Sequence, residues 1–340
     1  MRVLGGILVL LAISDARASE IVRVRVFSTA QQKIEIYDNH KLSQIIKKED
    51  IKAPVEIKGD SLRINAQIMP PHIILHPRNN NVDVIAVLNM EEYLKGVLPH
   101  EMPLVWPLEA LKAQAIVARS FTLRQIEARK DNPYHLDSTV NDQMYKYGST
   151  FTAQELENLT RALEQTKDEI LETQSGSTVR ALYHADCGGQ TEKASKVWGQ
   201  KEVEFSVKDV DHATPYSNWN FKISAEELKA KLKTGFVPHN LAVTAESLSQ
   251  RAVQMEVIGL NQEREKLSSQ EFRKLVGYSK LKSTRFQIQK INKDFHFKGS
   301  GFGHGVGLCQ WGARAWARTG KNYKEILKHY FPSYSLITKR

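Results

Sequence analysis

The first candidate for catalysis is a single glutamate between two prolines. Glu101 lies in the segment GVLPHEMP, residues 96–103, where the prolines restrict the backbone on either side. A carboxyl group that donates a proton near neutral pH needs a raised pKa, and Met102, Leu104 and Trp106 are apolar residues that would raise it. The N-terminus of a helix that starts shortly afterwards would lower it. By residue type alone, Glu101 is either a general acid or a solvated turn residue.

Two further segments combine residues that are suited to binding a sugar. The loop 136–148 contains Gln143 and Tyr145, an amide for hydroxyl groups and a ring for the apolar sugar face, although a hydrogen-bonded surface loop has the same composition. The glycine-rich segment GFGHGVGLCQWG, residues 301–312, superficially resembles a phosphate-binding loop, but a lone glycine run is weak evidence. We expect its glycines to let the backbone approach a ligand and to direct His304 into a cleft.

The two cysteines of the chain lie inside conspicuous motifs. Cys187 belongs to the segment YHADCGGQT, and Cys309 belongs to the glycine-rich segment. In an oxidising compartment such a pair most often forms a disulfide, and closing so long a loop would stabilise the fold by roughly 4–5 kcal/mol. The alternative is a zinc site formed by both cysteines with His184 and His304, whose ligand types fit but whose spacings do not match the usual patterns. The sequence favours the disulfide and leaves the zinc site open.

The start of the chain predicts export. An apolar run at residues 3–13 is followed by the small-residue pattern Ala16-Arg17-Ala18, which is typical of a signal peptide cleaved after residue 18. The run is too short to span a membrane, which needs about 20 residues. We therefore expect a protein of the periplasm or cell wall.

Loss of residues 1–18 lowers the net charge from +10 to +9. Such a basic protein suits an anionic wall polymer, and because its basic residues are scattered among acidic ones, nucleic acid is not expected.

The spacing of apolar residues predicts an α+β fold. Residues 21–89 alternate like strands, most clearly at 22–26, 33–37, 62–66 and 82–87. A long amphipathic helix is expected from Pro107 to about Lys130. Further helices are predicted from the capping pairs Thr152/Glu155, Ser224/Glu227 and Ser268/Glu271, with Gly277 closing the last, and at 310–318 and 323–330.

Four parts are expected along the chain. Residues 1–18 form the signal peptide and 19–80 a strand-rich N-terminal region. Residues 81–202 and 290–340 form a catalytic core, and 203–289 form an inserted α/β subdomain without an obvious chemical constellation.

Taken together, these motifs resemble the SpoIID/LytB family of cell-wall proteins. The resemblance rests on residues 96–103, on AQAIVARSF at 113–121, on QMY at 143–145, on 183–191 and on GHGVGLCQWGA at 303–313, which follow one another in the family's order. It implies a SpoIID-like core and a lytic transglycosylase that acts on peptidoglycan glycan strands stripped of their peptides. Glu101 matches the family's catalytic glutamate.

Some family members bind zinc in the loop before the QMY element. Here the matching positions are Asp137, Asn141 and Asp142, so the family's metal is not carried over to this loop, and no cofactor is expected. The resemblance and the motifs suggest a set of residues that bind or orient the substrate: Arg119, Gln143, Tyr145, Tyr183, His184, His304 and Gln310.

The predicted reaction needs one carboxyl group. Glu101 would protonate the bridging oxygen, and its carboxylate would then accept the proton of the C6 hydroxyl of N-acetylmuramic acid, giving a 1,6-anhydro ring. One alternative is a hydrolase with Asp137, Asp142 or Asp186 as its second carboxylate. Another is a non-catalytic wall-binding protein that enhances an amidase. An amidase that acts upstream is a further possible partner.

Overall fold

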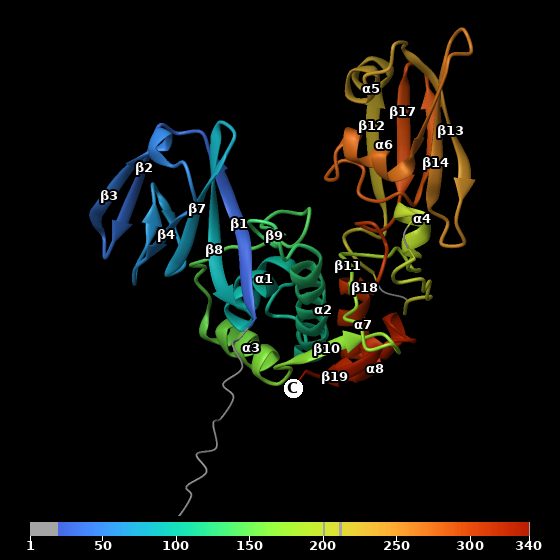
Figure 1. The fold of residues 1–340 in the computed structure, drawn as a ribbon. Helices are drawn as coiled ribbons and strands as arrows, with labels where there is room; N and C mark the ends of the chain where they lie inside the picture. Colours follow the sequence, from blue (N-terminus) through green and yellow to red (C-terminus); the bar gives the residue numbers. More distant parts are fainter. Residues whose placement is uncertain (1–19, 200, 211–212, 340) are drawn as a thin grey trace, which may run out of the picture.

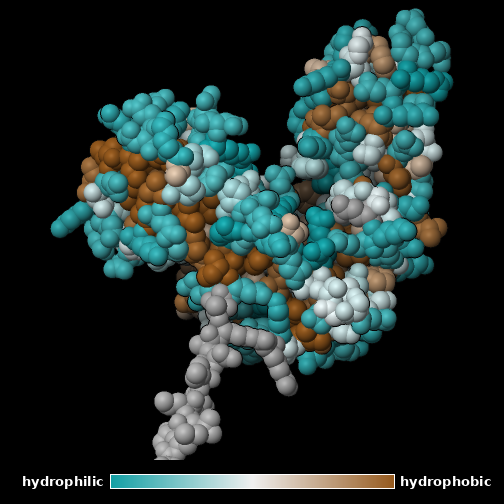
Figure 2. Space-filling model, viewed as in Figure 1, coloured by the Kyte–Doolittle hydropathy of each residue, from teal (hydrophilic) through white to brown (hydrophobic). Residues whose placement is uncertain are grey.

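The computed structural model describes residues 20–199, 201–210 and 213–339 of the 340. The predicted signal peptide lies outside these residues. Helices and strands are both abundant, which confirms the α+β prediction. Figure 1 shows an N-terminal arm of strands and a second, mixed arm that rise from a helical base, and Figure 2 shows the notch between the arms on a mostly hydrophilic face. Within the described part of the chain, no helix combines the length and hydrophobicity needed to cross a membrane.

The N-terminal arm consists of two small sheets around one hydrophobic core. The first has the order β4-β7-β8-β1-β9, with β4 at Val55–Lys58, β7 at His72–Arg78, β8 at Asn81–Asn89, β1 at Ile21–Thr29 and β9 at Leu136–Asp137. The second has the order β3-β2-β5-β6, with β3 at Lys41–Lys47, β2 at Lys33–Asp38, β5 at Arg63–Ile64 and β6 at Gln67–Ile68. A short 3-10 helix, η1, spans Lys48–Asp50. Alternate residues such as Ile34 and Ile36 point into the core, as the predicted strand period requires.

The base is built around two consecutive helices, α1 (Met90–Glu101) and α2 (Leu108–Ala128). The prediction that Glu101 lies on a proline-fixed turn is wrong, because α1 continues through Pro99 and ends at Glu101. Asn89 and Glu92 form a capping box that starts this helix. The predicted helix after Pro107 is confirmed within two residues, but α2 is buried on most sides rather than along one stripe.

The remaining elements of the base surround α2. Helix α3 (Ala153–Glu164) starts with the predicted capping box of Thr152 and Glu155, and the two C-terminal helices are confirmed as α7 (Gln310–Arg318) and α8 (Tyr323–Tyr330). Strand β10 (Glu169–Glu172) pairs with β19 (Ser335–Thr338), and a short helix α4 spans Ala194–Trp198. Strand β11 (Tyr183–His184) runs parallel to β18 (Leu308–Cys309), so the segment YHADCGGQT and the glycine-rich segment lie side by side.

The second arm has its own hydrophobic core. One sheet has the order β12-β17-β16, with β12 at Trp219–Ser224, β17 at Asp294–Gly299 and β16 at Phe286–Ile291. The other has the order β13-β14-β15, with β13 at Pro238–Glu246, β14 at Ala252–Gly259 and β15 at Arg264–Ser268. Helices α5 (Ala225–Leu232) and α6 (Ser269–Val276) start at the predicted caps Ser224 and Ser268, and Gly277 ends α6. Strand β17 belongs to the first of these two sheets. The second arm therefore extends to residue 299, beyond residue 289, where the inserted subdomain was predicted to end.

Candidate active site

A cleft of about 450 Å³ brings together residues from four of the motifs. We call it the Glu101 cleft and define it by six of the residues that line it: Glu101, Met144, Tyr183, His184, His304 and Gln310. These residues come from the end of α1, the loop after β9, strand β11, the glycine-rich segment before β18, and the start of α7. The parallel pairing of Tyr183 with Leu308 and of His184 with Cys309 places the two histidine motifs on one wall.

The surroundings of Glu101 favour a protonated carboxyl group. Burial raises the pKa of Glu101, while the hydrogen bond from the Met144 backbone N–H to Oε1, at 2.7 Å, and the nearby Tyr183 hydroxyl lower it in part. Glu101 is the last residue of α1, and the negative end of a helix dipole disfavours a carboxylate. Met102 and Leu104, two of the apolar residues expected near Glu101, are buried in the hydrophobic core of the base.

The polar groups opposite Glu101 are neutral. Burial lowers the pKa of His304 to about 3, and the cations Arg273 and Arg251 contribute to that decrease. Burial likewise holds the pKa of His184 well below its usual value. The buried Tyr183 hydroxyl faces the carboxyl group, its pKa is raised well above 10, and it has no partner within hydrogen-bonding geometry among the described residues. These groups therefore offer hydrogen bonds rather than charges to a ligand.

Two predicted binding residues support the cleft from behind instead of lining it. The Gln143 side chain is fully buried, and its Oε1 accepts hydrogen bonds from the hydroxyl groups of Tyr93, at 3.0 Å, and Thr122, at 2.9 Å. The Tyr145 ring stacks on Tyr93 with centroids 5.4 Å apart and is 3% exposed. The prediction that Gln143 and Tyr145 contact substrate is therefore replaced by a scaffolding role, because neither side chain reaches the cleft surface.

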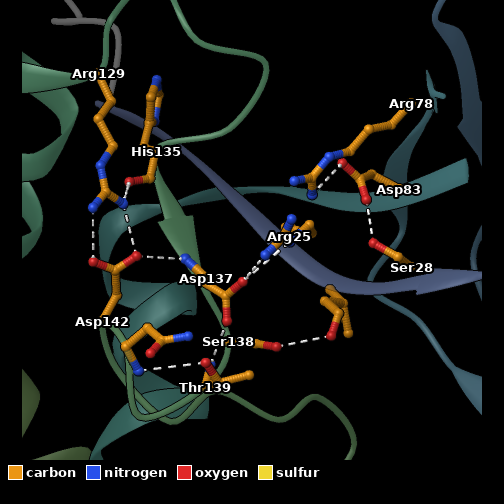
Figure 3. A network of polar contacts seen from close by, with 12 residues as sticks. Arg25, Ser28, Arg78, Asp83, Arg129, His135, Asp137, Ser138, Thr139 and Asp142 are labelled. Atoms are coloured by element: carbon orange, nitrogen blue, oxygen red, sulfur yellow. Dashed lines mark hydrogen bonds and ion pairs between the residues drawn. The ribbon is translucent and has the colours of Figure 1, made fainter. Parts of the chain in front are cut away.

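Ion pairs hold the loop that carries Met144 (Figure 3). The Asp142 carboxylate accepts two hydrogen bonds from the Arg129 guanidinium, at 2.7 and 3.1 Å, one from Gln125 at 3.0 Å and one from the Asp137 backbone N–H at 2.9 Å. Asp137 in turn pairs with Arg25 of β1. These contacts occupy the loop positions at which the family resemblance would place metal ligands, and they fix the backbone N–H that faces Glu101.

The three residues considered as a second catalytic carboxylate are all held by hydrogen bonds or ion pairs. Asp137 and Asp142 are engaged in the ion pairs just described. Asp186 accepts a hydrogen bond from the Gly188 backbone N–H at 2.7 Å and another from the Thr214 hydroxyl. Of the described residues that line the cleft, only Glu101 and Asp142 carry carboxyl groups. The Asp142 carboxylate already accepts the four hydrogen bonds given above.

Arg119 is the clearest error among the predicted binding residues. Its side chain is 2% exposed and donates to both carboxylate oxygens of Glu91, at 3.0 and 3.1 Å, and to the carbonyl oxygens of Thr166 and Glu169. It therefore joins α2 to α1 and to the start of β10, away from the cleft. Gln310, by contrast, lines the cleft as predicted and lies beside Gln114 of α2.

The second arm contributes residues that sequence reasoning missed. Gln270, Arg273 and Tyr278 all line the cleft, although their segment carries no recognisable motif. Arg273 donates to two backbone carbonyl oxygens and lies under the Tyr278 ring, 4.7 Å from its centroid. Only an arginine in the last turn of a helix marks this place in the sequence, and that signal is too common to identify a site.

Cys187 and Cys309 are both buried free thiols in the structure, so the predicted disulfide is not formed there. Burial and the adjacent Cys187 thiol raise the pKa of Cys309. His304 does not belong to the compact group of donor atoms around the two sulfurs, whereas His184 does. The four-residue zinc site considered from the sequence is therefore not assembled as proposed.

Comparisons with known proteins support the resemblance. Residues 78–172 match the family described as stage II sporulation protein (SpoIID), and residues 157–307 match a domain of unknown function. An uncharacterized protein of Brachyspira hyodysenteriae is 32% identical over 272 residues, which cover 77% of this chain and 70% of that protein. Stage II sporulation protein D of Bacillus amyloliquefaciens is 31% identical over 258 residues, 71% of this chain and 72% of the relative. The amidase enhancer of Bacillus subtilis is 27% identical over 296 residues, 72% of this chain but 40% of that protein.

Proposed function

This chain belongs to the SpoIID family, and on that premise we propose that it is an exported lytic transglycosylase that cleaves the glycan strands of peptidoglycan. The observation that carries the proposal is the Glu101 carboxyl group, whose pKa is raised by burial and which lines a cleft with two neutral histidines and a tyrosine hydroxyl. A carboxyl group kept protonated near neutral pH is what protonation of a glycosidic oxygen requires.

The first step is proton transfer to the leaving sugar. Glu101 donates its proton to the oxygen that links N-acetylmuramic acid to the next N-acetylglucosamine, and positive charge develops at C1 of the muramic acid as the bond breaks. The carboxylate that remains is stabilised by the Met144 N–H at 2.7 Å. The Tyr183 hydroxyl, which faces the same carboxyl group, also favours the charged form. Both contacts therefore become stronger as the proton leaves.

The second step closes a ring within the same sugar. The Glu101 carboxylate accepts the proton of the C6 hydroxyl, whose oxygen forms a bond to C1 and gives the 1,6-anhydro product. No water is consumed, and Glu101 regains its proton. Because the attacking hydroxyl belongs to the substrate, its effective concentration is high and no second catalytic carboxylate is needed. This fits a cleft in which Asp142 is already fully hydrogen-bonded.

The other residues of the cleft are assigned to substrate binding. Tyr183 and His184 belong to the wall of the cleft, but the Tyr183 hydroxyl and the His184 Nε2 atom are themselves buried. His304 and Gln310 also line the cleft, and we assign their polar atoms to hydrogen bonds with sugar hydroxyl or acetamido groups. The high positive charge of the protein and the Arg180 and Arg273 side chains along the cleft suit the free carboxylates of peptide-stripped strands.

The test is digestion of intact and peptide-stripped peptidoglycan, followed by mass analysis of the released sugars. We expect 1,6-anhydro ends, with faster release from the stripped strands. Products heavier by one water, with reducing ends, would show hydrolysis and would contradict the proposed ring closure. No release from either substrate would contradict the enzymatic proposal altogether.

A second candidate function is favoured by one relative, which is named an amidase enhancer. In that case the cleft binds glycan strands without cutting them and the protein stimulates a separate amidase. A Glu101→Gln variant separates the two functions. If it still stimulates an amidase on purified walls and the wild type releases no sugar, the binding function is correct. If the wild type releases anhydro sugars and the variant does not, the enzyme is correct.

A further inference from the structure

A compact group of metal-binding side chains lies beneath the wall of the Glu101 cleft. One ring nitrogen of His184 and the sulfur atoms of Cys187 and Cys309 all lie within 4.8 Å of one another. His184 is 5% exposed and both cysteines are fully buried. The mechanism proposed above uses neither cysteine.

The backbone around the two sulfurs is arranged as it is around metal-bound thiolates. The Gly189 N–H donates to the Cys187 sulfur at 3.3 Å, and the Cys309 sulfur accepts from the N–H groups of Cys187, at 3.2 Å, and Gly312, at 3.3 Å. Cys309 is also the N-cap of α7, where the helix dipole favours negative charge. N–H donors to sulfur are the outer contacts that orient and stabilise thiolate ligands.

The third donor is oriented in the same way as metal-bound histidines. The Nδ1 atom of His184 lies 3.1 Å from the carbonyl oxygen of Val306, and its Nε2 atom has no hydrogen-bond partner among the described residues. A ligating histidine commonly uses one ring nitrogen for such a carbonyl contact and keeps a lone pair for the metal. The nearest carboxylate is Asp209, whose Oδ2 lies 3.3 Å from the Cys187 sulfur and whose two oxygens accept from the Tyr330 hydroxyl at 2.8 Å.

We propose that His184, Cys187 and Cys309 bind one Zn²⁺ ion, with Asp209 the nearest oxygen ligand for the fourth position. Two thiolates and an imidazole are the donor set that Zn²⁺ prefers. Zinc–sulfur bonds of about 2.3 Å in a tetrahedron place two sulfurs about 3.8 Å apart, so small side-chain movements suffice to close the site. Binding releases the two thiol protons to solvent.

This assignment differs from the disulfide that the sequence favours. A disulfide would use the two sulfurs alone and would leave the His184 lone pair and the Asp209 carboxylate without a role at the site. The zinc ion instead joins three separate segments: the one that follows β11, the one around Asp209 and the start of α7. Its role is structural, because it holds the wall that presents Tyr183 to Glu101. The inference does not depend on the proposed reaction.

The test uses the full mature chain, purified without chelators, and measures metal content together with free thiols after denaturation. We expect about one zinc ion per chain and two titratable thiols once the metal is removed. The Cys187→Ser and Cys309→Ser variants should lose the zinc, whereas the matched control His239→Gln, an exposed histidine in the second arm, should retain it.

Because the serine variants also risk misfolding, the wild-type protein provides a second readout. Chelator-treated protein titrated with Co²⁺ should bind one equivalent and develop the intense visible absorption of a tetrahedral thiolate site, and Zn²⁺ should displace it and raise Tm. A mass two hydrogens lower with no free thiols would show a disulfide and would overturn the proposal. Two free thiols that bind neither Co²⁺ nor Zn²⁺ would overturn it as well.

Discussion

Replacing Asp142 with asparagine tests how the loop after β9 controls Glu101. The change keeps the size of the side chain but removes its charge, and it places an amide N–H₂ where the carboxylate now accepts from Arg129 or from the Asp137 backbone. The loop should loosen, and the Met144 N–H should no longer be held at 2.7 Å from the Glu101 carboxylate.

The size of the effect follows from the burial of the pair. The Asp142 side chain is 4% exposed but the Arg129 side chain is 32% exposed. An exposed pair contributes about 0–1 kcal/mol, whereas breaking a buried pair costs about 3–5 kcal/mol. Asp142→Asn should therefore lower the free energy of unfolding of the base by about 2–3 kcal/mol. Misplacing the catalytic carboxyl group should lower kcat/KM by about 10- to 100-fold.

The pH dependence separates positioning from stability. The Met144 hydrogen bond lowers the pKa of Glu101, so losing it raises that pKa. A general acid is active when protonated, and its rate falls as pH rises through its pKa. The alkaline limb of the pH–rate profile of Asp142→Asn should therefore move to higher pH, measured on peptide-stripped glycan at a temperature where the variant is folded.

Two comparisons make this prediction refutable. The exposed pair of Glu157 and Arg161 on α3 offers a matched control, and Glu157→Gln should change neither stability nor the pH profile. In a double-mutant cycle, Asp142→Asn and Arg129→Gln should couple by about 1–3 kcal/mol. A folded Asp142→Asn variant with wild-type kcat and an unshifted alkaline limb would refute a positioning role for the loop.

Three further predictions follow from neighbouring contacts. Tyr183→Phe removes a hydroxyl that lowers the pKa of Glu101, so the alkaline limb should move to higher pH and kcat/KM should fall about tenfold, as a pH–rate series would show. Arg119→Gln leaves Glu91 without its partner and should lower the free energy of unfolding by about 3 kcal/mol in denaturant titrations, with kcat of the folded variant unchanged. Gly96→Ala puts a methyl group 2.6 Å from the Lys146 carbonyl oxygen and against the Tyr145 ring. The free energy of unfolding should fall by about 1–3 kcal/mol, and thermal unfolding should show a lower Tm.

The elements with strong local signals could be predicted from the sequence. Helices α7 and α8 were predicted at their observed bounds, and Thr152, Ser224 and Ser268 start helices as their capping patterns indicate. These signals work because a side-chain oxygen that bonds a free backbone N–H acts within one turn of the helix.

The continuation of α1 through Pro99 to Glu101 could not be predicted because tertiary packing overrides the local signals there. Gly96 and Pro99 both disfavour a helix interior. The glycine is nevertheless required, since Tyr145 and Lys146 pack directly against its Cα. The buried side chains of Tyr93, Leu94 and Val97 supply the hydrophobic contacts that hold the helix. Reading this segment as a turn reversed the expected effect of the nearby helix dipole on Glu101.

The sequence motifs identified some residues of the candidate site, but they did not show which side chains reach the cleft. Tyr183, His184, His304 and Gln310 lie in motifs that the parallel pairing of β11 and β18 brings together. Gln143, Tyr145 and Arg119 lie in motifs too, but a motif does not show which of its side chains face inward. The Arg273 contribution comes from an arm with no motif, and only the three-dimensional arrangement reveals it.

The most direct test is the rate at which Glu101→Gln releases anhydro sugars from peptide-stripped glycan, compared with the wild type at equal amounts of folded protein. Glutamine keeps the shape but cannot donate or accept the proton, so the rate should fall by at least about 100-fold. Because burial raises the pKa of Glu101, a neutral side chain should leave Tm at neutral pH unchanged or higher. A folded variant that releases anhydro sugars at the wild-type rate would contradict the assignment of Glu101 as the acid and base.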